Sequence, residues 1–427
     1  MAICCGGSGT AHAQKWVNPH FEAHRLDYRD LGYPPAYEIA ADNRRITALL
    51  AVPRGRVYGA TSGKQACLFV YEPAINKVRP LGRIADAQGV YHALVRGRDG
   101  KLYLGTGLNL LADVPLTRDF PGGPRAIEEQ LWKDITALYR GYAGGHLLRY
   151  DPENDQQVRL PEDPCPLEDL GIPAPGNSIY ALATDAAAGA VYGISYPDAL
   201  LFVHDPESGK SQNLGPLLTR RVFSGPERTW RSVPRGLHVA ADGRVYTSGD
   251  DGVIVYYDPK RRAIARTEMR IPGEYWEVWN YHGYPVVEQF VADGPQWIFG
   301  ATSDGFLFRM EPSAERLDNL GKPRVSRRVR GMAVGPDRKL YLICGEFEEP
   351  CKLYSFDLAG ERGFQDLGVL AVDRSPYYAK RAYQFDAIAC ATDGTLFLGE
   401  SDRRGSLFLY FPGTRGFPGT LNPSNPR

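Results

Sequence analysis

One short pattern recurs along nearly all of the 427 residues of this chain. It reads Asp-Gly-x-hydrophobic-aromatic-x-Gly, then a turn, then Leu-Phe-x-Tyr-Asp-Pro, as in DGRVYTSGDDGVIVYYDP at 242–259. Seven copies can be aligned, a short apolar strand precedes each copy, and a polar stretch ending in Leu-Gly follows most of them. Each copy supplies two strands, so every unit has four strands. Such a chain is a repeat protein.

The spacing of the copies identifies the kind of repeat. Tyr246 and Phe299 are 53 residues apart, and Phe299 and Tyr341 are 42 apart. Four-stranded repeats of about 40 to 50 residues are typical of propeller blades. Asp-Gly turns and alternating apolar residues fit antiparallel hairpins. We therefore predict an all-β fold, a seven-bladed β-propeller with four antiparallel strands per blade.

The two ends of the chain predict how the ring closes. The last copy stops after SLFLYFP without a fourth strand, whereas residues 20–32 (HFEAHRLDYRDLG) have the sequence of an isolated fourth strand. We expect the N-terminal strand to complete the last blade, which would remove open sheet edges. We also expect residues 15–427 to form a single domain.

The first 14 residues contain an Ala-x-Ala site followed by Gln14, which resembles the cleavage end of a secretory signal. This remnant predicts a periplasmic or secreted location.

A helical insertion departs from the repeat at about residues 108–143. Its segment 124–142 carries one apolar stripe, formed by Ile127, Leu131, Ile135 and Leu138. The helix could wall a binding site over one face of the propeller or decorate a blade edge. A smaller insertion at 271–285 is rich in aromatic residues, including Trp279 and Tyr281, and suggests a sugar-binding rim.

Charge and cysteine content narrow the classes of partner. The 50 basic and 50 acidic side chains balance, so we expect neither nucleic-acid binding nor membrane insertion. We also expect a monomer. The seven cysteines form no Cys-x-x-Cys metal signature. Cys344 and Cys351 flank one hairpin, where they could form a disulfide or remain two buried thiols.

One position at the start of the innermost strands is polar in all seven blades. Aligning these strands places Thr47, His92, Tyr180, Arg235, Glu288, Arg330 and Asp386 in one column. Because innermost strands line the central channel, these residues should form a ring near one mouth. The ring could bind a polar ligand, or its charged members could pair with one another as a structural network.

Two further residues should converge on this ring. His146 and Tyr196 flank hairpin turns between second and third strands, which share a face with the starts of the innermost strands. A cluster of His92, His146, Tyr196 and Arg235 suits β-elimination of a uronic-acid glycoside.

Each group has a role in that reaction. Arginine would neutralise the carboxylate, a histidine or tyrosine would remove the C5 proton, and tyrosine or the second histidine would protonate O4. Hydrolysis by Glu288 and Asp386 is one alternative, and a non-catalytic propeller that binds a glycan or a protein is another.

The segments YHAL, DGKLYLGT, GGHLLRYDP, GISYPD and LFVHDP, within residues 91–206, resemble the seven-bladed propeller polysaccharide lyases. This group includes ulvan lyases and L-rhamnose-α-1,4-D-glucuronate lyases, and related propellers act as rhamnosidases. The resemblance implies a lyase that cleaves a rhamnose–glucuronate linkage in a polysaccharide or oligosaccharide of arabinogalactan or ulvan type.

Carried over to this chain, the resemblance implies the catalytic residues His92, His146, Tyr196 and an arginine, for which Arg235 is favoured over Arg220 and Arg221. The substrate-binding residues that we expect beside them are Tyr180, Arg221, Glu288, Arg330, Trp279 and Tyr281. The chemistry requires no cofactor. Some members of this group hold a metal ion, so the resemblance also allows a structural calcium or zinc ion, for which the sequence indicates no ligands.

Overall fold

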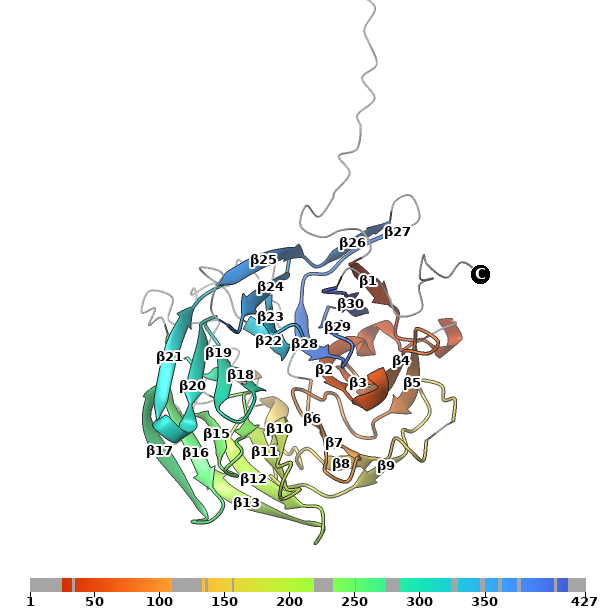
Figure 1. Ribbon diagram of the computed structural model, residues 1–427. Helices are drawn as coiled ribbons and strands as arrows, with labels where there is room; N and C mark the ends of the chain where they lie inside the picture. Colours follow the sequence, from red (N-terminus) through yellow and green to blue (C-terminus); the bar gives the residue numbers. More distant parts are fainter. Residues whose placement is uncertain are drawn as a thin grey trace, which may run out of the picture.

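The computed structural model describes residues 25–32, 35–109, 133–134, 137–155, 157–218, 233–249, 251–273, 285–323, 329–345, 350–359, 363–374, 378–402 and 405–413. Within these residues the strands form seven four-stranded antiparallel sheets and one two-stranded sheet. Figure 1 shows the sheets arranged as blades around a central axis, with β2, β6, β10, β18, β22 and β28 nearest to it. The predicted seven-bladed, all-β propeller is confirmed.

The first four blades follow one another along the chain. Blade 1 consists of β2 (Arg45–Ala51), β3 (Val57–Ser62), β4 (Cys67–Glu72) and β5 (Lys77–Arg83). Blade 2 consists of β6 (Leu94–Arg96), β7 (Leu102–Gly105), β8 (Leu147–Tyr150) and β9 (Leu167–Asp169). Blade 3 consists of β10 (Ser178–Thr184), β11 (Val191–Tyr196), β12 (Leu200–Asp205) and β13 (Lys210–Pro216). Blade 4 consists of β14 (His238–Val239), β15 (Val245–Ser248), β16 (Val253–Asp258) and β17 (Ala263–Arg270).

The remaining blades complete the ring. Blade 5 consists of β18 (Val287–Asp293), β19 (Trp297–Thr302), β20 (Leu307–Glu311) and β21 (Arg316–Gly321). Blade 6 consists of β22 (Val329–Val334), β23 (Lys339–Cys344), β24 (Lys352–Asp357) and β25 (Phe364–Val369). Blade 7 consists of β28 (Phe385–Cys390), β29 (Leu396–Glu400), β30 (Leu407–Tyr410) and β1 (Leu26–Arg29). The two-stranded sheet is a hairpin of β26 (Ala371–Arg374) and β27 (Tyr378–Arg381) between blades 6 and 7. Short 3-10 turns span Pro35–Tyr37, Ala41–Asn43, Pro53–Gly55 and Pro312–Ala314.

The N-terminal strand closes the ring as the sequence predicts. Strand β1 pairs antiparallel with β30, from Leu26 opposite Tyr410 to Arg29 opposite Leu407. Leu26 is buried in the core of this blade. The fourth strand of blade 7 therefore comes from the start of the chain, which covers the edge of β30 (Figure 1).

A glycine that directly follows the aromatic residue of the second strand has a packing role. In three blades a glycine of the second strand lies opposite a phenylalanine of the third strand, in the pairs Gly59 with Phe69, Gly193 with Phe202 and Gly300 with Phe308. A Cβ atom on these glycines would lie 2.1, 2.2 and 2.1 Å from the facing ring. The ring thus folds over the glycine, so these three blades need both residues.

Two other sequence expectations can be compared with the structure. Residues 133, 134 and 137–139 of the insertion are helical, and Leu138 of the predicted apolar stripe is 43% exposed. Ile127, Leu131 and Ile135 lie outside the described residues. Cys344 and Cys351 are buried in the thiol form. Among the described residues, no helix is long and apolar enough to cross a bilayer.

Candidate functional site

Five of the seven predicted ring residues occupy β-bulges in the innermost strands. The bulged residues are Thr47, Tyr180, Glu288, Arg330 and Asp386. In blade 1, for example, Ile46 pairs with Thr61 and Ala48 with Ala60, so the residue between them faces no partner. A bulge inserts one extra residue and re-aims its side chain. The same local irregularity therefore recurs around the propeller and sets the ring position.

His92 and Arg235 occupy the equivalent positions just before β6 and β14. Their backbones join the inner strands of neighbouring blades: Leu182 N–H donates to the His92 carbonyl at 3.2 Å, and Arg235 N–H donates to the Val287 carbonyl at 2.9 Å. The backbone of both residues is thereby tied to the next blade. Neither position depends on a free loop.

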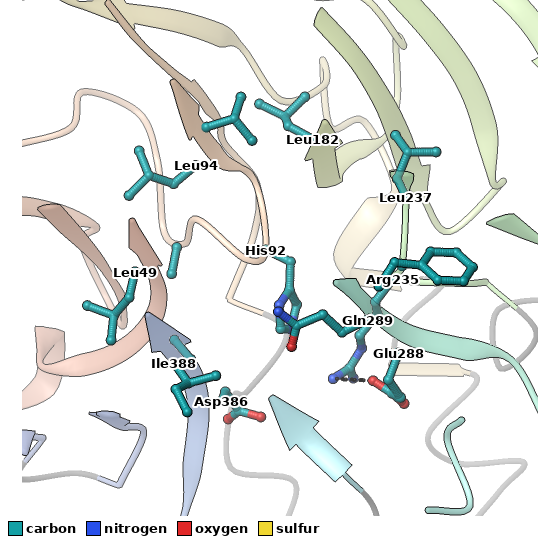
Figure 2. A pocket seen from close by; sticks show the side chains of 15 residues that line it. Leu49, His92, Leu94, Leu182, Arg235, Leu237, Glu288, Gln289, Asp386 and Ile388 are labelled. Atoms are coloured by element: carbon teal, nitrogen blue, oxygen red, sulfur yellow. Dashed lines mark ion pairs between the residues drawn. The ribbon is translucent and has the colours of Figure 1, made fainter. Parts of the chain in front are cut away.

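A cavity of about 160 Å³ lies on the axis. Its polar lining consists of His92, Arg235, Glu288, Gln289 and Asp386, which converge in Figure 2. Two residues further along the inner strands, its apolar lining includes Leu49, Leu94, Leu182, Leu237, Phe290 and Ile388. The channel thus has a polar layer next to an apolar layer, because the residues at these two positions of each strand differ in character.

The charged members of the ring form two ion pairs between neighbouring blades. Arg235 Nη1 lies 3.2 Å from Glu288 Oε2, and Arg330 Nη1 lies 3.1 Å from Asp386 Oδ1 (the first pair is drawn in Figure 2). The Glu288 and Asp386 side chains are only 4% and 9% exposed. The pairing expected of a structural network is present. Breaking such a pair would leave a buried carboxylate without its cation.

Electrostatics fixes the charge states of the ring. Burial alone would raise the pKa of Asp386, but Arg330 lowers it most and Arg235 also lowers it, so that it lies below the ordinary value. Burial opposes the charge of Arg235 as well, yet Glu288 and Tyr180 raise the pKa of its guanidinium. The carboxylate of Asp386 and the guanidinium of Arg235 are therefore both ionised near neutral pH.

His92 is neutral at the centre of this network. Burial, and after it the charge of Arg235, lower the pKa of its imidazole to about 4, although Asp386 and Glu288 act in the opposite direction. A neutral imidazole has one nitrogen lone pair that can accept a proton. At the cavity wall, His92 can thus act as a base.

Tyr180 and Tyr196 lie beside Arg235. The Arg235 Nε–H donates to the Tyr180 hydroxyl oxygen at 2.5 Å, and the guanidinium carbon lies 5.3 Å from the ring centroid. The Tyr196 ring is tilted against the Tyr180 ring, with centroids 5.1 Å apart. Tyr196 therefore supports Tyr180 from behind, and both rings are buried.

His146 does not join this group. Its Nδ1 hydrogen-bonds Asp169 Oδ2 at 2.8 Å, on the outermost strand of blade 2, and it is not part of the cavity lining. Its backbone lies at the expected face, where His146 N–H donates to Thr106 Oγ1 at 2.8 Å. His92 and Arg235 thus line one cavity, whereas Tyr196 and the His146 side chain do not line it; Tyr196 is connected to Arg235 through Tyr180. Arg221, Trp279 and Tyr281 lie outside the described residues.

Two residues of the site were not anticipated from the sequence. Gln289 follows Glu288 where the other six blades have alanine or glycine. This difference is visible in the alignment and could have identified Gln289 as a residue of the site. Its side chain accepts Met332 N–H at 2.6 Å and donates to the Met332 carbonyl at 3.0 Å, bracing the next blade. The other residue, Tyr139, comes from the helical insertion and packs on Tyr196 with centroids 5.9 Å apart. Its partner lies in another blade, so no local pattern identifies it.

Among the residues that the structure describes, no three His, Cys, Asp or Glu side chains gather where they could hold a metal ion.

Comparisons with known proteins place the fold but not the family. No protein-family model matches the chain. A search of curated proteins finds no match either.

Among solved structures, a streptogramin B lyase has a TM-score of 0.57 at 9% identity, over 91% of this chain and 99% of that one. Virginiamycin B lyase from Staphylococcus aureus has a TM-score of 0.55 at 10% identity, with the same coverage. The extracellular domain of a putative one-component system from B. thetaiotaomicron has a TM-score of 0.51 at 12% identity; the match covers 91% of this chain but only 40% of that one. At these identities the likeness concerns the propeller fold alone.

Proposed function

We propose that this protein is a carbon–oxygen lyase that cleaves a uronic-acid-containing glycan by β-elimination, outside the cytoplasm. The observation that carries the proposal is the neutral imidazole of His92 facing the same cavity as the cationic Arg235. A base and a carboxylate-binding cation at one small site are what abstraction of a proton next to a carboxylate requires. The substrate class follows from the resemblance of residues 91–206 to propeller lyases of rhamnose–glucuronate linkages.

The residues take the following roles in this proposal. Arg235 binds the uronate carboxylate, and His92 accepts the C5 proton. The electron pair of the C5–H bond forms the C4–C5 double bond as the C4–O4 bond breaks. Because Tyr180 accepts a hydrogen bond from Arg235, its own phenolic proton is available for the departing O4. Tyr196 has a supporting role through its contact with Tyr180, and His146, whose side chain is bonded to Asp169, has no part in the proton transfer in this proposal.

Hydrolysis is less well supported by the same cavity. A glycosidase needs one carboxyl group that stays protonated near its working pH. Asp386 is instead held ionised with a lowered pKa, and Glu288 is paired with Arg235. The two carboxylates are therefore engaged by the arginines.

The reaction class can be tested with arabinogalactan from gum arabic and, in parallel, with ulvan. Elimination creates a C4–C5 double bond conjugated to the carboxylate, so ultraviolet absorbance should rise as either glycan is cleaved. Release of free rhamnose without a rise in absorbance would show that the protein is a hydrolase and not a lyase. Glycan binding without any product would instead support a binding propeller.

A further inference from the structure

The end of the helical insertion is fastened to blade 3 beside the site. Tyr139 Oη lies 2.7 Å from Ser178 Oγ. The same Ser178 oxygen accepts the N–H of Leu108, at the start of the insertion, at 3.1 Å. Ser178 therefore holds both described ends of the insertion at the first residue of β10.

From this anchor, contacts lead to the cavity. The Tyr139 ring packs on Tyr196 at 5.9 Å, and Tyr196 packs on Tyr180 at 5.1 Å. Tyr91 contacts Tyr180 from another direction, with centroids 6.3 Å apart. Tyr180 in turn accepts the Nε–H of Arg235. Each ring from Tyr139 to Tyr180 is thus in contact with the next.

Such a series matters because an arginine side chain has many rotamers. Fixing one of them costs rotamer entropy, of which the planar guanidinium group loses less for each hydrogen bond that it forms. Close-packed interiors transmit displacements between neighbouring side chains. The orientation of Arg235 thus depends on how firmly the Tyr180 ring is held.

We propose that Tyr139 is a positioning residue, through which the insertion holds Tyr196 and Tyr180 so that Arg235 is oriented toward the cavity. Its value for substrate binding rests on the proposed lyase function, whereas the mechanical link does not. The hydroxyl and the ring of Tyr139 contribute separately: the hydroxyl fixes the insertion to Ser178, and the ring supports Tyr196.

Hydrogen exchange at Arg235 tests the link without any turnover. In protein labelled with ¹⁵N-arginine, the Arg235 Nε–H signal is assigned by its loss in Arg235→Lys. We expect Tyr139→Ala to speed its exchange with solvent by about three- to tenfold, the equivalent of one ordinary hydrogen bond. Tyr139→Phe, which keeps the ring, should have a smaller effect. Tyr192→Ala is the matched control, because Tyr192 is a buried tyrosine of the same blade that packs on Tyr257 at 6.1 Å.

The outcomes separate this inference from the proposed function. Unchanged exchange in Tyr139→Ala, or equal acceleration in Tyr192→Ala, overturns it even if the protein is a lyase. If Tyr139→Ala does not fold, Ser178→Ala must show the acceleration, and unchanged exchange there overturns the inference as well. If glycan cleavage is observed, Tyr139→Ala should raise KM more than it lowers kcat, since Arg235 binds the carboxylate before and during the reaction. If the wild-type protein is inactive on these glycans, the proposed lyase function is wrong, but the exchange result for Tyr139 remains valid.

Discussion

The Nε–H of Arg235 donates to the hydroxyl oxygen of Tyr180 at 2.5 Å, and this bond joins blades 3 and 4 at the mouth of the channel. The same guanidinium pairs with Glu288 of blade 5 at 3.2 Å. One side chain thus links three blades and also lines the cavity. Stability and ligand binding depend on the same residue.

Replacing Arg235 should therefore destabilise the fold through Glu288. Arg235→Met leaves a carboxylate that is 4% exposed without its cation, at a cost of about 3 to 5 kcal/mol. The double variant Arg235→Met, Glu288→Gln should recover part of this loss, because the uncompensated charge is removed. Urea unfolding of the two single variants and the double variant measures the coupling. Additive effects would show that the pair contributes nothing beyond its separate members.

The histidines should make stability depend on pH in the acidic range. The folded-state pKa of His92 and of His238 is about 4, against an ordinary value of 6.5, and burial is the first cause for both. Between these values the unfolded chain binds more protons, so stability is fully present above pH 6.5 and falls as pH decreases toward 4. His92→Gln should reduce this slope, measured by urea unfolding at successive pH values. An unchanged slope would mean that His92 titrates normally.

Glu400 should produce the opposite dependence of stability on pH over a largely overlapping range. Burial raises the pKa of this carboxyl from 4.5 to about 7, although Lys380, whose Nζ lies 2.9 Å from Glu400 Oε2, lowers it. The contribution of Glu400 to the free energy of unfolding is therefore present below pH 4.5 and is lost as the pH rises through 7. The stability of Glu400→Gln relative to wild type should therefore increase as the pH is raised from 5 to 8. A constant difference across this range would contradict the raised pKa.

The repeat glycines should not tolerate a side chain. A Cβ atom at Gly193 would lie 2.2 Å from the Phe202 ring and 2.8 Å from a methyl group of Leu182, so Gly193→Ala should cost about 1 to 3 kcal/mol. Phe202→Leu in the same chain should recover part of the loss by making room. The melting temperatures of the two single variants and the double variant test this. A wild-type melting temperature for Gly193→Ala would show that the ring moves at no cost.

The repeat allowed the ring architecture to be predicted, because spacing and turn residues are local signals. The seven blades, the closure by β1 and the polar column all follow from aligning copies. The alignment also placed Glu288 and Asp386 at the channel, but it could not show that bulges put them there, since a bulge is a property of the pairing between strands.

Other parts of the site depend on contacts that a repeat does not encode. Side chains alternate between the two faces of a strand, so the sequence indicates which face each side chain occupies. It does not indicate that His146 is bonded to Asp169 of the outermost strand. Tyr139 belongs to an insertion without a counterpart in the other blades, so its packing on Tyr196 appears only in three dimensions.

The most direct test of the account compares wild type with His92→Ala in the ultraviolet assay on gum arabic arabinogalactan and ulvan. His238→Ala is the control, because His238 is also a neutral histidine, half-buried, but packs on Phe290 and does not line the cavity. Loss of the base should slow elimination by about 10² to 10⁴-fold. We predict that loss for His92→Ala alone, with glycan binding retained. A wild-type rate in His92→Ala, or no absorbance rise with the wild-type protein on either glycan, would contradict the proposed elimination.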